Sequence, residues 1–149
     1  MSGKIVMSLF LAAALIFGGL LYYFQVYAYY APTEKLSSIT VGEAEIAVGF
    51  YEGIDSTTSP NKLRACFEVA PEAFDGLVPV DDADPLIAPS WFECFDAEGI
   101  AKDLEAGRAR AYIAADETPE GAVGYEILRF VAVYPDGRAF LWRHYREAE

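Results

Sequence analysis

The chain has 149 residues and a formal charge of −12 at pH 7. Lys4 is the only charge before residue 34, so the rest carries all 23 acidic and 10 of the 11 basic residues, a net charge of −13. That acidity argues against nucleic acid and anionic lipid surfaces as partners, and it favours a cationic partner or simply solubility. The roughly 115 residues after the first charge-free stretch suffice for one domain with its own core and are too few for two.

The stretch from Ile5 to Tyr30 carries no charge. Because about 20 apolar residues cross the roughly 30 Å hydrocarbon core of a bilayer, this stretch predicts a transmembrane helix. The rival interpretation is a cleaved signal peptide, with Val26–Tyr27–Ala28 as a poor cleavage site. A signal peptide has an apolar region of about 7–15 residues, and this one is longer, which favours the uncleaved anchor.

Tyrosine and phenylalanine crowd the end of this stretch, where rings that favour the headgroup level mark the exit from a membrane. Tyr23, Tyr27 and Tyr30 recur at helical spacing and predict contact with another protein segment, with a plain aromatic girdle as the alternative. Ser8, Ala12 and Gly19 fall near one helix face, and small residues let transmembrane helices approach closely. These six residues are the predicted membrane-partner contacts.

The charge before the stretch sets the expected topology. Lys4 and the amino terminus favour a cytoplasmic N-terminus, which places the acidic domain in the periplasm of a Gram-negative bacterium. In that compartment Cys66 and Cys94 are expected to form a disulfide, closing a loop of about 29 residues, with two buried free thiols as the alternative. The expected location is the bacterial inner membrane.

Three regions are predicted: an anchor over residues 1–30, a linker over residues 31–36 and a domain over residues 37–149. Pro32 is expected to end the helix. Inside the domain the first predicted strands are Ser38–Val41 and Glu45–Tyr51, around Gly42. Lys62–Val69 alternates between apolar and polar residues, which predicts a strand with Cys66 off the main apolar face.

The second half of the domain begins with an irregular, proline-rich segment, Pro71–Ser90, and an aromatic core segment, Trp91–Phe95. Asp96 is expected to cap a helix over Ala97–Ala106 that Gly107 ends. A strand over Arg108–Ala115 and a hairpin of Gly124–Tyr134 with Arg138–Tyr145 follow. The Tyr134–Pro135–Asp136–Gly137 connection suits a type I turn with a bulge. The predicted fold is an N-terminal transmembrane helix followed by a small α+β domain with an antiparallel sheet and one main helix.

No motif predicts catalysis, a cofactor or a metal, and the chain is not expected to be an enzyme. A lone histidine, His144, in a strand pattern indicates a structural role. Asp81, Asp82 and Asp84 lack EF-hand spacing and are interpreted as a solvated acidic loop rather than a Ca²⁺ site. The cysteines do not form a C-x-x-C motif, and there is no P-loop or dinucleotide fingerprint.

The anchor also resembles that of a known group of proteins. Gly3–Lys4–Ile5, the Ala/Gly-rich span and the aromatic run Tyr22–Tyr30 resemble a family of small uncharacterised alphaproteobacterial single-pass membrane-anchored proteins. The likeness is carried mainly by the anchor, and the acidic domain is similar to theirs in size. It implies a bacterial inner-membrane setting, and it assigns no activity and no catalytic residue.

The expected function is therefore that of a non-catalytic accessory subunit of an inner-membrane complex. A respiratory assembly is one candidate host, where the acidic periplasmic domain would help to dock a basic partner such as cytochrome c. The expected partners are transmembrane subunits, the lipid bilayer and a basic periplasmic protein, without nucleic acid. The alternative is a free-standing membrane-anchored binding or assembly factor. An enzyme that uses acidic residues is a third hypothesis, and it would need a pocket with convergent carboxylates.

Overall fold

The computed structural model describes residues 2–148, which form two compact units. The first unit ends at Tyr30 and the second begins at Ala31. The first unit contains helix α1, Gly3–Tyr23, which continues as a π-helical segment, Phe24–Ala28. No residue of α1 is buried. The helix over Gly3–Ala28 has 26 residues and a mean hydropathy of 2.3, so it is long and apolar enough to span a membrane. The predicted N-terminal apolar helix is confirmed.

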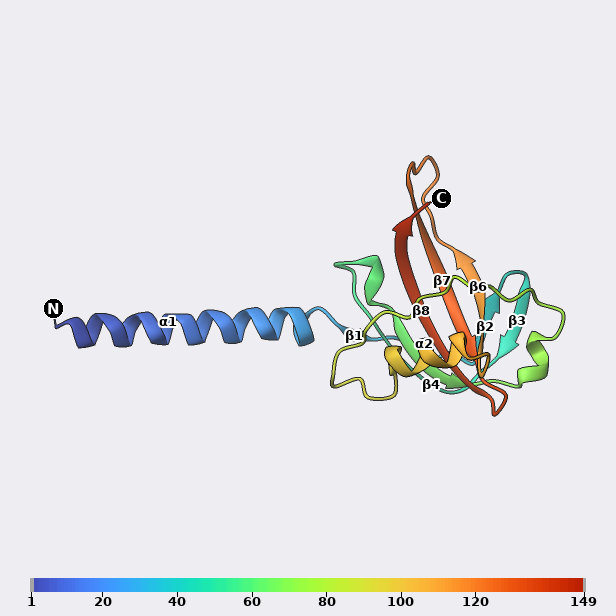
Figure 1. Cartoon of the computed structure of the whole chain (residues 1–149), viewed down its shortest axis with the longest axis horizontal. Coiled ribbons are helices and arrows are strands. Elements are labelled where there is room, and N and C mark those ends of the chain that lie inside the picture. Colours follow the sequence, from blue (N-terminus) through green and yellow to red (C-terminus); the bar gives the residue numbers. More distant parts are fainter. Residues whose placement is uncertain (1, 149) are drawn as a thin grey trace. The chain divides into compact units, whose positions relative to one another are not determined.

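The second unit is built on a twisted, fully antiparallel sheet (Figure 1). Its six strands lie in the order β1-β4-β5-β8-β7-β6. Their bounds are Ala31–Pro32 for β1, Gly49–Asp55 for β4, Arg64–Glu68 for β5, Arg110–Asp116 for β6, Tyr125–Val133 for β7 and Arg138–Glu147 for β8. A separate hairpin joins β2, Ser38–Val41, to β3, Ala44–Ala47. Helix α2, Ala97–Glu105, and two 3-10 turns, Pro60–Lys62 and Pro71–Phe74, complete the domain. The predicted α+β fold is confirmed.

Two segments differ from the sequence-based expectation. The predicted linker over residues 31–36 contains β1, which pairs with β4 through Ala31↔Asp55 and Pro32↔Ile54. The pairing of β1 with β4 gives hydrogen-bond partners to backbone groups that would bond to water in an unpaired linker. The predicted single strand Glu45–Tyr51 is divided between β3 and β4, because β3 pairs with β2 and β4 pairs with β5.

The hairpin face of the sheet carries one hydrophobic core. Ala65 of β5, Leu141 of β8 and Val131 of β7 lie in register across adjacent strands, because residues directly opposite in an antiparallel pair share a face. Residues of the β2–β3 hairpin pack onto them, including Ile39, Val41 and Ile46. The predicted alternation of β5 is confirmed, since Leu63, Ala65, Phe67 and Val69 all belong to this core.

The opposite face, called the helix face here, is aromatic. Trp142 and Phe130 stack with ring centroids 5.7 Å apart, and Phe95 packs edge-on against both Trp142 and Phe140. Helix α2 adds Ile100, which is buried. Asp96 caps α2 by accepting a hydrogen bond from the Gly99 N–H, and Gly107 ends it with a φ of +73°. Both helix boundaries follow the capping residues predicted from the sequence.

Candidate functional site: an acidic cleft beside α2

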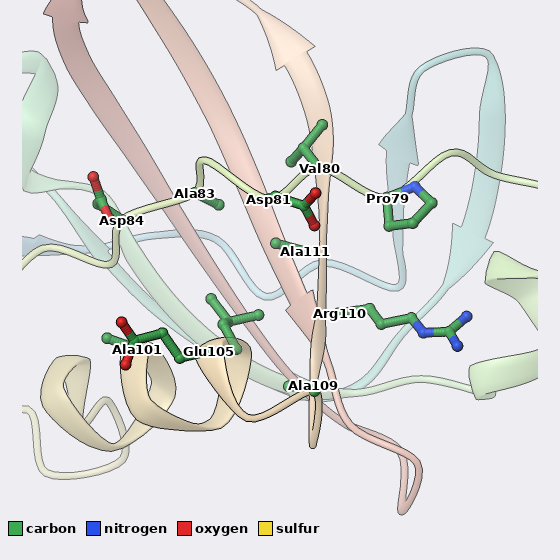
Figure 2. Close-up of a pocket in the computed structure, with 12 residues that line it drawn as sticks. Pro79, Val80, Asp81, Ala83, Asp84, Ala101, Glu105, Ala109, Arg110 and Ala111 are labelled. Carbon is green, nitrogen blue, oxygen red and sulfur yellow. The ribbon is translucent and has the colours of Figure 1, made fainter.

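An open cleft of about 820 Å³ lies between α2, the segment 79–84 and the start of β6. Three carboxylates stand around it, those of Asp81, Asp84 and Glu105, together with one guanidinium, that of Arg110. In Figure 2 the side chains of Asp84 and Glu105 lie on the α2 side of β6, whereas Arg110 extends away on the other side. The space that faces α2 is therefore predominantly negative.

The cleft exists because small side chains form its floor. Ala83, Ala109 and Ala111 are buried there, and Ala101 of α2 is partly exposed at its wall. Leu104 is the largest apolar lining residue on α2. Since an alanine side chain fills little volume, the helix and the strand leave space between them.

Hydrogen bonds hold the walls of the cleft in place. The Val80 N–H donates to the Ala111 carbonyl oxygen at 2.8 Å, which ties the loop to the edge of β6. Arg146 of β8 donates to the Asp82 carbonyl oxygen at 3.0 Å and pairs with its carboxylate at 3.0 Å. On the helix, Asp103 accepts from the Tyr134 hydroxyl at 2.6 Å and from Arg108 at 2.7 Å. The hydrogen bond from Tyr134 is the main reason that the pKa of Asp103 lies below its ordinary value.

Arg64 holds the next part of the covering segment. Its side chain lies on the helix face, is only 3% exposed, and donates to the carbonyl oxygens of Leu86 at 2.9 Å and Ile87 at 3.0 Å. It also donates to the carbonyl oxygens of Asn61 and Leu63. Arg64 was not among the residues singled out from the sequence. The only signal for it was its charge inside the predicted strand Lys62–Val69, which precedes the irregular segment Pro71–Ser90.

A second cleft, of about 750 Å³, opens on the hairpin face. Arg129 and Arg143 lie directly opposite each other on β7 and β8, and both donate to the carboxylate of Glu117. Asp55 of β4 pairs with Arg143 at 3.3 Å. The two guanidiniums are paired mainly with these carboxylates. The ion pairs therefore link β4, β7 and β8 to the β6–β7 connection and leave little unpaired charge on the two arginines.

The single histidine, His144, lies on β8 near the charges of Arg146, Asp84 and Arg64. It is half-buried on the helix face, and burial, followed by the nearby Arg146, lowers its pKa. Over residues 2–148 there is no group of three or more His, Cys, Asp or Glu side chains that could hold a metal ion. In the acidic loop, Asp82 is paired with Arg146, while Asp81 and Asp84 line the cleft.

The two cysteines are bonded to each other. The Sγ atoms of Cys66 and Cys94 lie 2.14 Å apart, and the Cα atoms lie 6.3 Å apart. As expected, the bridge lies off the main apolar face of β5, because Cys66 pairs across from Phe140 of the helix face. It fastens the segment before α2 to the sheet.

The predicted membrane-partner contacts lie along the first unit. Ser8 donates to the Lys4 carbonyl oxygen at 2.9 Å, so its hydroxyl is used within the helix. Ala12 and Gly19 are exposed on α1. The rings of Tyr23 and Tyr27 stack at 6.3 Å, and Tyr30 lies beyond the helix. The π-helical segment between Phe24 and Ala28 shifts the helical register, so the three tyrosines do not form a regular α-helical stripe.

Comparison with known proteins yields a family but no characterised relative. No curated protein and no solved structure matches the chain. One family model, described as a family of unknown function (DUF6446), matches residues 35–148. That range takes in β2 to β8 together with the acidic cleft and the disulfide. The chain belongs to this family.

Proposed function

We propose that the chain is a non-catalytic, membrane-anchored accessory subunit whose acidic cleft holds a basic segment of a partner protein. The observation that supports this most is the cleft beside α2, which combines three carboxylates with a floor of small side chains. Lysine and arginine side chains have an apolar stem and a charged head, and they can lay the stem on such a floor while the head meets the carboxylates.

The charge of the domain fits the same proposal. The net charge of −13 over residues 34–149 would attract a basic partner over some distance, and this attraction weakens as salt is added. A respiratory complex is one proposed host, with a basic carrier such as cytochrome c as the docked partner. Transmembrane subunits of that host would contact the aromatic end of α1.

The proposed setting is the inner membrane of a bacterium, with the N-terminus in the cytoplasm and the domain in the periplasm. An exposed apolar helix near the N-terminus supports the anchor. The single positive charge before that helix, Lys4, supports the orientation. The resemblance of the anchor to small alphaproteobacterial membrane-anchored proteins supports the bacterial source.

The second candidate is a free-standing membrane-anchored binding or assembly factor. It is favoured by the packing of the domain, which is one compact unit with side chains packed on both faces of its sheet. The two candidates differ in what holds the partner. Alanine substitution of Tyr23, Tyr27 and Tyr30 should remove a stable subunit from its complex, whereas a transient factor should still bind through the cleft.

A pull-down of the full-length chain in mild detergent tests the proposal. The wild type should recover one multi-subunit membrane complex in stoichiometric amount. A variant with Asp84→Asn and Glu105→Gln should recover less, because two cleft carboxylates are neutralised, and Ala101→Leu should do the same by filling the cleft at unchanged charge. The matched control is Glu120→Gln with Glu147→Gln, which removes two exposed carboxylates outside the cleft. Recovery of the chain alone would contradict the accessory-subunit proposal.

A further inference from the structure

The β4 strand contains a non-glycine residue in the left-handed region of backbone conformation. Phe50 has a φ of +53°, and within residues 2–148 it is the one non-glycine residue with a positive φ. A bulky side chain in the left-handed region is a genuine outlier, because its Cβ atom crowds the backbone there. It lies in an irregularity of the β4–β5 pairing, between Gly49 and Glu52.

The ring of Phe50 contributes nothing visible to the core. The residue is 87% exposed, whereas its neighbour Tyr51 is 6% exposed and stacks on Phe67. Gly49, directly before Phe50, does not have a positive φ, and a Cβ atom added to it would meet no other atom within 4 Å. The chain therefore has an aromatic residue where glycine would suit the backbone, and a glycine where a side chain would fit.

The charges beside Phe50 are negative. Glu68 of β5 pairs across from Gly49, and Glu52 pairs across from Cys66, so both carboxylates stand beside the irregular turn of β4 and both are exposed. None of the ion pairs among the described residues uses either of them. The nearest base in the ladder is Arg138, opposite Glu68, and it is paired with Asp136 at 2.8 Å and stacked over Tyr134.

We propose that Phe50, with Glu52 and Glu68, is a second contact surface, one that receives an arginine or lysine side chain of a partner protein. A cation over an aromatic face is attracted by the ring quadrupole, and two flanking carboxylates add direct charge pairing. Charge complementarity favours a basic side chain, because an apolar partner would bury both carboxylates without an opposite charge. The surface is distinct from the acidic cleft, because three strands separate β4 from β6 in the sheet.

The first test uses a peptide probe and the full-length chain in nanodiscs of neutral phosphatidylcholine. The probe is a fluorescent peptide of alternating glycine and arginine, and the control peptide has citrulline, which is uncharged and of the same shape. To isolate this surface from the cleft, all titrations use a background carrying Asp84→Asn and Glu105→Gln. We expect the arginine peptide to bind and the citrulline peptide not to bind. Failure to bind the arginine peptide in this background would overturn the inference and leave the cleft proposal untouched.

The second test separates binding from stability. Phe50→Gly should weaken arginine-peptide binding by about threefold while the melting temperature stays equal or rises, because glycine relieves the left-handed strain. Phe50→Tyr should bind as the wild type does. Val123→Gly is the matched control, because Val123 is 89% exposed in another loop, and it should leave binding unchanged.

Two results would contradict the inference. One is unchanged affinity in Phe50→Gly, which would make the ring irrelevant to binding. The other is a lower melting temperature in both Phe50→Gly and Phe50→Asn, since asparagine also tolerates a left-handed φ and both variants should relieve strain. That result would show that the ring stabilises the fold itself.

Discussion

Single side chains hold much of the irregular half of this domain in place, and Arg64 is the clearest case. Its guanidinium is buried on the helix face and donates to carbonyl oxygens of Leu86 and Ile87 in the covering segment. Replacement by methionine keeps the apolar stem but leaves these carbonyl groups without a donor. A buried acceptor left unpaired is costly, so Arg64→Met should lower the free energy of unfolding by about 3 kcal/mol in urea titrations. Arg110→Met, at an exposed position, should change it by less than about 0.5 kcal/mol.

A second residue-scale prediction concerns the hydrogen bond from Tyr134 to Asp103. The bond, helped by Arg108, holds the pKa of Asp103 below its ordinary value. Stability gained this way is present above the unfolded pKa of about 3.9 and is lost as the pH falls through the folded pKa. Tyr134→Phe keeps the ring but removes the donor, so the pKa of Asp103 should rise towards its ordinary value in a carbon-detected NMR titration. Asp136, whose pKa is lowered by its contacts with Arg138, is the internal control and should titrate as before.

At the scale of elements, the β7–β8 hairpin depends on a glycine at one position of its turn. Gly137 has a φ of +94°, and a Cβ there would lie 2.8 Å from the Val69 carbonyl oxygen. The backbone has little freedom to shift, because the Val69 N–H donates to the Gly137 carbonyl oxygen at 2.8 Å. Gly137→Ala should therefore lower the free energy of unfolding by more than about 2 kcal/mol. Gly121, with a φ of +81° and no atom near its Cβ position, provides the comparison, and Gly121→Ala should cost only about 1 kcal/mol. Equal losses in the two variants would show that the contact with Val69 is unimportant.

The sequence predicts best those elements whose bounds are set by residues close together in the chain. Helix α2 begins at Asp96, whose side chain caps the first turn, and ends before Gly107. The Pro135–Asp136–Gly137 turn joins two strands that are adjacent in both the chain and the sheet. The division of Glu45–Tyr51 between two sheets and the pairing of Ala31–Pro32 with β4 depend on distant partners, so local patterns do not reveal them. The cleft was missed for the same reason, because its lining brings together alanines of α2, of β6 and of the segment before α2. Alanine at such positions looks like ordinary helix or strand composition in the sequence.

At the scale of the whole molecule, the disulfide and the proposed topology depend on each other. A bridge between Cys66 and Cys94 closes a loop of about 29 residues and is worth about 3–4 kcal/mol from loop-closure entropy. Such bonds persist mainly outside the reducing cytoplasm. The domain that carries the bond also carries all 23 acidic residues, whereas the segment before the apolar helix carries only Lys4. The disulfide and the position of Lys4 both favour the proposed periplasmic side of the membrane for the domain.

Cysteine labelling tests that topology directly in a Gram-negative bacterium. Thr58 is exposed in the loop between β4 and β5, and Ser2 precedes α1. In intact spheroplasts a membrane-impermeant maleimide should label Thr58→Cys, because the proposed topology places the domain outside the cytoplasm. It should label Ser2→Cys only after lysis, because the proposed topology, argued from Lys4 and the amino terminus, places this end in the cytoplasm. The native cysteines should remain unlabelled until a reductant is added, which controls for the disulfide. Labelling of Ser2→Cys without lysis, together with protection of Thr58→Cys, would reverse the orientation and would place the acidic cleft before cytoplasmic partners instead.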